Sequence, residues 1–95
     1  METTFYILLS MKTYNGPESF AQFFIGNNRE AAYALFSKLK GTTEASDGNV
    51  LYIDFMETVN GLPLNLKLIT CNLEQLAENC KLITKEVFKL RNLLG

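Results

Sequence analysis

An Asn-Gly pair between two apolar, β-branched runs is the feature that most constrains this chain. Residues 49–59 and 62–71 alternate apolar and polar side chains, and Asn60-Gly61 stands between them. Asn-Gly is the preferred pair for a two-residue hairpin turn, because both positions of that turn need a positive φ. The sequence therefore predicts a β-hairpin with strands over residues 49–59 and 62–71.

A two-residue loop also fixes which residues of the two strands stand opposite one another. On one side of this hairpin it predicts three mainly apolar pairs: Phe55 with Leu66, Ile53 with Leu68, and Leu51 with Thr70. On the other side it places Met56 opposite Asn65 and Asp54 opposite Lys67. We interpret the charged pair as a surface ion pair of little energy and not as a catalytic dyad.

A helix is predicted after this hairpin and another one earlier in the chain. Asn72 can cap a helix over residues 73 to about 94, and Gln75 stands at the capping-box position. Asn28 can cap a helix over residues 29–40, which is rich in helix formers. Both segments carry apolar residues at helical spacing, which indicates that each helix packs one face on a core.

The first 26 residues predict a second hairpin, which has two apolar faces. Its strands cover residues 3–13 and the apolar run 20–25, and its turn is Tyr14-Asn15-Gly16-Pro17. A three-residue loop places one apolar group on one face: Ile7, Leu9, Met11, Ala21, Phe23 and Ile25. The other face then carries Tyr6, Leu8, Phe20 and Phe24 beside Ser10, Lys12 and Gln22.

The two hairpins also share letters, which leaves a second assignment of these faces open. Residues 11–16 (MKTYNG) match residues 56–61 (METVNG) at four of six positions. A duplicated ββα unit would explain the match, and so would the turn chemistry that any two hairpins share. Aligning the hairpins by these letters would turn Tyr6, Leu8 and Phe24 toward the helices instead.

The order of these elements predicts the fold class. Two hairpins, each followed by a helix, give a single α+β domain over residues 1–95 with the order ββαββα. We expect a four-stranded antiparallel sheet with two helices packed on one face, which is a two-layer sandwich. In such a fold the other face of the sheet is normally polar.

The apolar outer face of the first hairpin therefore indicates that something covers it. The last helix carries leucines outside its main apolar stripe, and its end extends beyond the reach of short strands. We interpret these features as a subunit contact and expect a homodimer. The candidate interface residues are Tyr6, Leu8, Phe20, Phe24, Leu82 and Leu93.

The chain contains no histidine, and this excludes much catalytic and metal chemistry. Ser-His and Cys-His nucleophile pairs, imidazole metal ligands and an unperturbed proton shuttle near neutral pH all need that side chain. Cys71 precedes the cap of the last helix, and the nearest lysine in the sequence, Lys67, is expected on the other face of the strand, so we expect an inert thiol. Cys80 falls in the apolar stripe of that helix, which indicates a core residue. We expect no enzyme, no metal and no cofactor.

Charged residues of the last helix are explained by the helix itself. Glu74 and Glu78 lie near its start, whereas Lys81, Lys85 and Lys89 repeat toward its end. This order complements the helix dipole and is typical of a solvated face. A formal net charge of −1 also disfavours a nucleic-acid partner.

The N-terminal segment shows no export signal. Its apolar run, residues 5–9, is interrupted by Ser10 and Lys12, and it is too short to span a bilayer. Two cysteines do not make a disulfide framework. We expect a cytoplasmic protein with no membrane partner.

The function predicted from these features is a non-catalytic protein–protein interaction or self-association module. The alternative from another class is a small-ligand-binding or regulatory domain. Its pocket would open between the helices and the sheet, near the polar loop of residues 42–49. No motif in the chain is specific enough to choose a ligand or to indicate a family.

Overall fold

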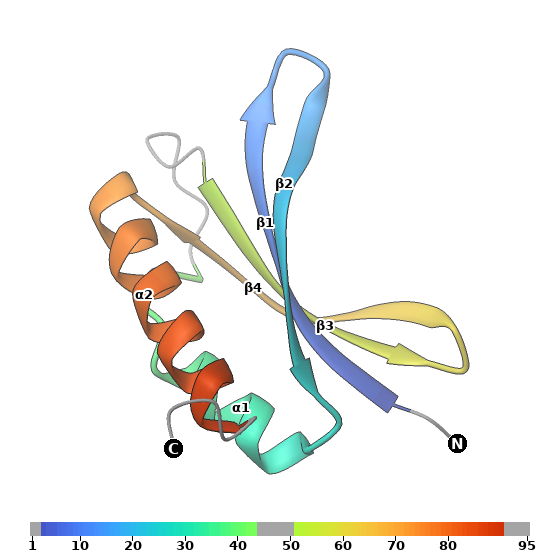
Figure 1. The fold of residues 1–95 in the computed structure, drawn as a ribbon. Helices are drawn as coiled ribbons and strands as arrows, with labels where there is room; N and C mark the ends of the chain where they lie inside the picture. Colours follow the sequence, from blue (N-terminus) through green and yellow to red (C-terminus); the bar gives the residue numbers. More distant parts are fainter. Residues whose placement is uncertain (1–2, 44–50, 91–95) are drawn as a thin grey trace.

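The computed structural model, which describes residues 3–43 and 51–90, has the element order ββαββα. The strands form one antiparallel sheet in the order β2-β1-β3-β4, and both helices lie on the same side of it (Figure 1). This arrangement confirms the predicted fold class. The elements are β1 Thr3–Thr13, β2 Gly16–Gly26, α1 Arg29–Ser37, β3 Leu51–Val59, β4 Leu62–Cys71 and α2 Leu73–Leu90.

The two central strands, β1 and β3, build the core with alternate side chains. Ile7 of β1 stands opposite Phe55 of β3, and both are fully buried against the helices. Phe36 of α1 stacks on the Phe55 ring, with centroids 4.9 Å apart. Ile83 of α2 is also fully buried in this cluster. Each buried aliphatic or aromatic side chain contributes about 1.5–3 kcal/mol, so this layer of side chains dominates the fold's stability.

The faces of the first hairpin follow its hydrophobic alternation and not the repeat of letters. Ile7 and Leu9 are buried under the helices. Tyr6, Leu8 and Phe24 point to the opposite side of the sheet, which we call the outer face. The assignment drawn from the shared letters is therefore wrong.

A β-bulge in β4 changes the predicted register of the second hairpin. The turn is as predicted, because Asn60 and Gly61 both have positive φ (53° and 83°), and Met56 stands opposite Asn65. Beyond that pair one extra residue, Leu66, shifts the ladder. The predicted pairs with Leu66, Leu68, Thr70 and Lys67 are wrong. The observed pairs are Phe55 with Lys67, Asp54 with Leu68, Ile53 with Ile69, and Leu51 with Cys71.

The bulge improves the packing of the core, which explains why β4 does not follow the regular register. It turns Ile69 and Cys71 toward the helices, where both are buried, while Leu66 keeps a partly buried place against the same cluster. The regular register would have buried the polar Thr70 side chain on this face instead. The consequence for the outer face is that Leu68 now lies on it.

The first hairpin contains the same kind of irregularity. Its loop has two residues, Tyr14 and Asn15, and not three, because Thr13 pairs with Gly16. An extra residue at Phe20 then restores the pairs that the three-residue loop predicts, such as Ile7 with Phe23. The two departures cancel, and for this reason the predicted faces around Ile7 hold.

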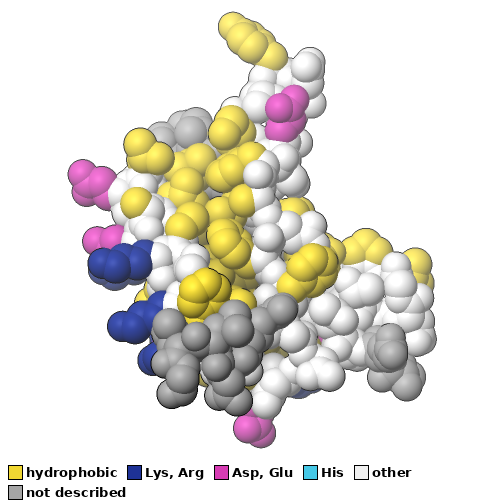
Figure 2. Space-filling view, in the orientation of Figure 1, with side chains coloured by type: hydrophobic (Ala, Val, Ile, Leu, Met, Phe, Trp, Pro, Cys, Tyr) yellow, Lys and Arg dark blue, Asp and Glu magenta, His cyan; other side chains and the backbone are white. Residues whose placement is uncertain are grey.

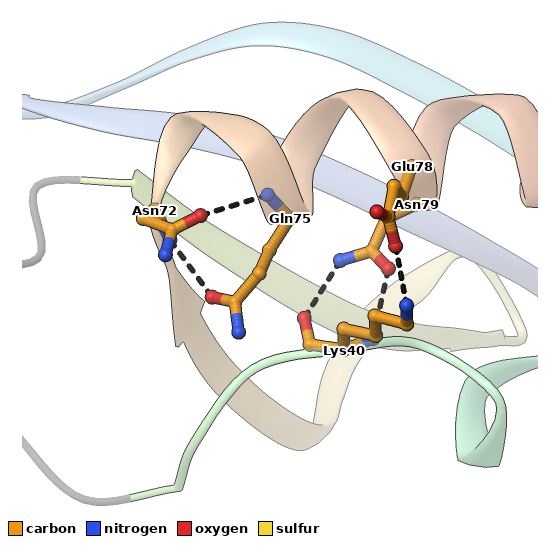
Figure 3. A network of polar contacts seen from close by, with 5 residues as sticks. All are labelled: Lys40, Asn72, Gln75, Glu78 and Asn79. Carbon is orange, nitrogen blue, oxygen red and sulfur yellow. Dashed lines mark hydrogen bonds and ion pairs between the residues drawn. The ribbon is translucent and has the colours of Figure 1, made fainter.

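Both helix caps are formed as predicted. The Asn28 side chain accepts a hydrogen bond from the Ala31 backbone N–H (3.0 Å). Asn72 and Gln75 form the reciprocal capping box, with donor–acceptor distances of 2.8 and 3.0 Å (Figure 3). Helix α1 ends at Ser37, before the predicted residue 40, and α2 is described to Leu90.

Helix α1 ends early because the segment that follows it is held between α2 and β4. The Asn79 side chain of α2 donates to the Lys40 carbonyl and accepts from its N–H, both at 2.8 Å (Figure 3). Thr42 then exchanges two backbone hydrogen bonds with Thr70 of β4. Gly41 between them has no room for a side chain, because a Cβ there would lie 2.6 Å from the Thr70 carbonyl oxygen.

The buried stripe of α2 is rotated from the predicted one. The helical spacing of its apolar residues predicts a buried stripe that includes Leu73 and Ala77, with Leu82 on nearly the opposite side. In the structure Leu73 and Ala77 are exposed, whereas Leu82 packs against the core cluster. The buried Asn79 explains the difference, since its contacts with the Lys40 backbone turn that side of α2 inward. A polar residue three positions after Leu76 and four before Ile83 was the signal in the sequence.

Candidate interface on the outer sheet face

The outer face carries a continuous set of apolar side chains from all four strands. The sheet register places them together, because directly opposed residues share a face. The two most exposed members are Phe24 of β2 and Leu68 of β4, with 53% and 45% of their surface accessible. The members are Tyr6, Leu8, Phe24, Tyr52, Met56 and Leu68.

The predicted interface residues do not all lie on this face. Tyr6 and Phe24 are cross-strand neighbours whose rings lie 6.0 Å apart, and Leu8 follows on the same side of β1. Phe20 is half-exposed at the bulge of β2. Leu82 belongs to the helix layer, on the other side of the sheet. Leu93 lies outside the residues that the structure describes.

A pocket of about 180 Å³ lies on the outer face. Residues of all four strands line it: Ser10, Pro17, Tyr52, Asp54 and Leu68. Ser10 is buried, and its hydroxyl lies 3.2 Å from the Ser19 hydroxyl. The volume is below the 300–1,000 Å³ that is typical of sites for drug-sized ligands, so the pocket suits a single side chain better.

Asp54 is the charged group of this pocket. The Asn65 amide donates a 2.8 Å hydrogen bond to its Oδ1. Burial raises the pKa of the Asp54 carboxyl above its ordinary value, and the bond from Asn65 opposes part of that rise. The predicted partner Lys67 lies on the helix side of the sheet, where its ammonium stands 5.7 Å from the centre of the Tyr33 ring.

The free edges of the sheet are protected against the addition of a further strand. Proline lacks the N–H that a neighbouring strand would accept, and both edge strands carry one near their start, Pro17 in β2 and Pro63 in β4. The far end of β4 is paired with Thr42. Both edges are therefore poor templates for a further strand.

The helix side of the sheet holds an ion pair that sequence analysis missed. Arg29 at the start of α1 donates to the Glu57 carboxylate of β3 at 2.6 Å, and Glu57 is buried. The Arg29 guanidinium also lies 5.2 Å from the centre of the Phe5 ring. An acidic residue in phase with the buried Ile53 and Phe55 was the available signal. The pair anchors α1 to the sheet and leaves no open site.

The cysteines show no sign of activation. Cys71 is buried, and Cys80 is partly buried beside it in α2. Burial raises the pKa of the Cys71 thiol, and the neighbouring Cys80 adds to the rise. Burial also raises the pKa of the Cys80 thiol. Both groups stay protonated thiols at neutral pH, and a protonated thiol is a poor nucleophile.

The charged side chains of α2 form surface ion pairs. Lys40 binds Glu78 at 2.5 Å, and Glu86 is approached by Lys38 at 3.4 Å and Lys89 at 3.7 Å. A shallow hollow of about 290 Å³ runs along this helix surface, lined by Glu78, Lys81, Leu82, Lys85, Glu86 and Lys89. Within residues 3–43 and 51–90, no three acidic or cysteine side chains come together as a metal site.

Hydrophobic side chains also gather between α2 and β2, where the two layers meet, with charged side chains along the outer side of α2 (Figure 2). Partly buried residues of these two elements pack against the core cluster: Ala21, Phe23, Leu76, Cys80 and Val87. This surface is the rim of the core, whereas neither of the two described helices lies over the outer face.

None of the described helices is long and apolar enough to cross a membrane. Comparison with known proteins found no relative: no family model, no curated protein and no solved structure matches the chain.

Proposed function

We propose that the protein is a non-catalytic self-association module that forms a homodimer through the outer face. The observation that carries the proposal is the exposure of Phe24 and Leu68 on a sheet face that no described helix or strand covers. An antiparallel sheet with one packed face normally has polar side chains on the other. A contiguous exposed apolar surface marks an interaction site.

A second copy is the occupant that the shape of this face favours. A twisted sheet is saddle-shaped. A two-fold rotation about an axis in the plane of the sheet, either along or across the strands, leaves the shape of a saddle unchanged but exchanges its two sides. Two identical outer faces are therefore complementary in shape, which agrees with the small angle at which sheets pack.

The available area supports the same partner. A stable interface needs about 800 Å² from each subunit. The fold measures 39 × 30 × 20 Å, and the 20 Å direction corresponds to the two layers of sheet and helices. The large faces of such a molecule offer the required area. A net charge of −1 adds little repulsion between two copies.

The buried Cys71 thiol, the partly buried Cys80 thiol and the absence of histidine support a non-catalytic role. The ligand-binding alternative placed its pocket near residues 42–49, of which 44–50 lie outside the described residues. Thr42 is bound to β4, and the pockets described above lie on the outer face and along α2. No observation favours that alternative, so we retain the dimer.

Sedimentation equilibrium of the full chain at micromolar to 100 micromolar concentration tests the proposal. We expect the wild-type chain to reach twice the mass of the monomer, 10.7 kDa. Phe24→Lys should weaken association by about tenfold or more, because it places an ammonium in the desolvated interface. Helix content measured by circular dichroism should not change.

Leu64→Lys is the matched control. Leu64 is 50% exposed, close to the value for Phe24, but it lies on the helix side of β4, opposite Glu57. This substitution should leave the mass of the dimer unchanged. A wild-type chain that stays monomeric at 100 micromolar, or equal effects of the two lysines, would contradict the proposal.

A further inference from the structure

The outer face carries one cation and one anion that do not pair with each other. Lys12 of β1 is exposed on this face, opposite Pro17, and Asp54 of β3 lines its pocket. Within the described residues neither charge forms an ion pair. Asp54 stands opposite Leu8, four residues or about 13 Å along β1 from Lys12, so the two groups of one chain are far apart.

The pocket has the chemistry of a site for a primary ammonium group. Its walls are the Tyr52 ring, Pro17 and Leu68, which suit an aliphatic stem, and its charged group is a single carboxylate. The Asn65 amide holds one carboxylate oxygen. The other oxygen has no hydrogen bond from any described residue. A half-buried anion without a cation gains most from a partner that brings one.

The same two-fold geometry that matches two outer faces brings these charges together. An axis across the strands at Ser10, midway between Leu8 and Lys12, exchanges the two ends of β1. It carries Lys12 of one copy over Leu8 of the other, next to Asp54 on the neighbouring strand. The symmetry then forms the contact twice. β1 and β3 are neighbouring strands about 4.8 Å apart, an offset that a lysine side chain spans.

We propose that the ammonium of Lys12 from a second copy enters the Asp54 pocket and so fixes the orientation of the dimer. The inference rests on the proposed self-association. Lys12 is the cation that fits, because other described basic residues near the sheet are engaged on the helix side, Arg29 with Glu57 and Lys67 with Tyr33. The remaining described lysines belong to α2 and to the segment after α1.

Charge reversal tests the pairing in the full-length chain. Lys12→Asp and Asp54→Lys should each raise the dimer dissociation constant by about tenfold or more, since each change places like charges at both contacts. An equimolar mixture of the two variants should form a heterodimer, because each contact then joins an aspartate to a lysine. Sedimentation velocity of the mixture and of each variant measures this directly.

An isosteric cycle covers the case in which Asp54→Lys fails to fold. Lys12→Asp should weaken the wild-type dimer but should have little effect in an Asp54→Asn background, where no carboxylate remains to repel it. Lys85→Asp on α2 makes the same change in net charge away from the outer face and serves as the control.

The outcomes separate this inference from the proposed function. A wild-type dimer that Phe24→Lys weakens, with charge reversals no different from Lys85→Asp, would overturn the Lys12 contact and leave the self-association standing. If Lys12→Asp and Asp54→Lys each fold on their own but do not associate when mixed, this result would also overturn the Lys12 contact. A monomeric wild-type chain would remove both proposals.

Discussion

The two hairpins of the sheet have the same register from the turn to the pair of Tyr6 with Phe24, although their turns differ. Adding 46 to a residue number of the first hairpin gives its equivalent in the second, so that Thr13 corresponds to Val59 and Gly16 to Leu62. Both second strands contain an extra residue at the same place, Phe20 in β2 and its equivalent in β4. The bulge is therefore a feature of the architecture and not an accident of one strand.

The turns show why matching letters mislead. The shared letters align the hairpins with a difference of 45, which places Asn15-Gly16 on Asn60-Gly61. In the structure the loop of the first hairpin is Tyr14-Asn15, and Gly16 begins β2 with φ of 98°. One residue of misalignment exchanges the two faces of every strand.

The clearest difference between the hairpins lies on the outer face. The equivalent of Leu8 in the first hairpin is Asp54 in the second. The first hairpin also carries Lys12 on this side. The first hairpin thus presents Leu8 where the second presents Asp54, and Lys12 where the second presents Thr58. The proposed pairing of two copies rests on this asymmetry.

The largest expected effect tests whether the hairpins contribute equally to the core. Ile7 and Ile53 are equivalent by register, and both are fully buried. Ile7→Ala and Ile53→Ala should each lower the free energy of unfolding by about 2–5 kcal/mol, through lost burial and a cavity. Urea unfolding of both variants measures the two values. A difference of more than about 2 kcal/mol would show that one hairpin dominates the core.

Much of this architecture could be predicted because the deciding signals are local. The turn at Asn60-Gly61, the caps Asn28 and Asn72, and the alternation around Ile7 each depend on neighbours in the sequence. They fixed the order of the elements and the core side of β1.

The rest depends on contacts between distant segments. The bulge at Leu66 is decided by burial of Ile69 and Cys71, and the rotation of α2 by the bond between Asn79 and Lys40. The position of Asn79 in the helical stripe is a local signal, but its partner Lys40 is 39 residues away in the sequence. The bulge at Leu66 has no local signal. The outer pocket around Asp54 was missed for the same reason, because the regular register placed Lys67 beside it.

An intermediate effect should distinguish the two turns. Asn60 has a positive φ of 53°, whereas no other described residue besides glycine does, so Asn15 has ordinary backbone angles. Asn60→Val should cost about 1–3 kcal/mol, because a β-branched residue strongly disfavours positive φ. Asn15→Val should cost less than about 0.5 kcal/mol, as is usual for exposed sites. Equal urea midpoints would mean that the two turns have the same backbone requirement.

The smallest expected effect concerns the outer-face position where the hairpins differ in charge. Asp54 has a raised pKa because burial disfavours its carboxylate, more than the hydrogen bond from Asn65 favours it. The folded chain therefore holds the proton of the Asp54 carboxyl more tightly than the unfolded chain does. The contribution of Asp54 to stability is most favourable when the group is protonated, and it is lost as the pH rises through the raised pKa.

Asp54→Asn removes this titration but keeps the shape and an oxygen that can accept the bond from Asn65. At a protein concentration where both chains are monomeric, the variant should be slightly more stable than the wild type at neutral pH. This advantage should shrink as the pH falls through the raised pKa and disappear below the ordinary pKa of an unfolded aspartate, because the wild-type carboxyl is then neutral in both states. Urea midpoints of the two proteins measured side by side from acidic to neutral pH isolate the effect, since every other carboxyl is common to both.

At dimer-forming concentrations the order should reverse at neutral pH, because the variant loses the carboxylate that we pair with Lys12. A variant that is less stable than the wild type as a monomer at neutral pH would show that Asp54 already has a stabilising partner within its own chain.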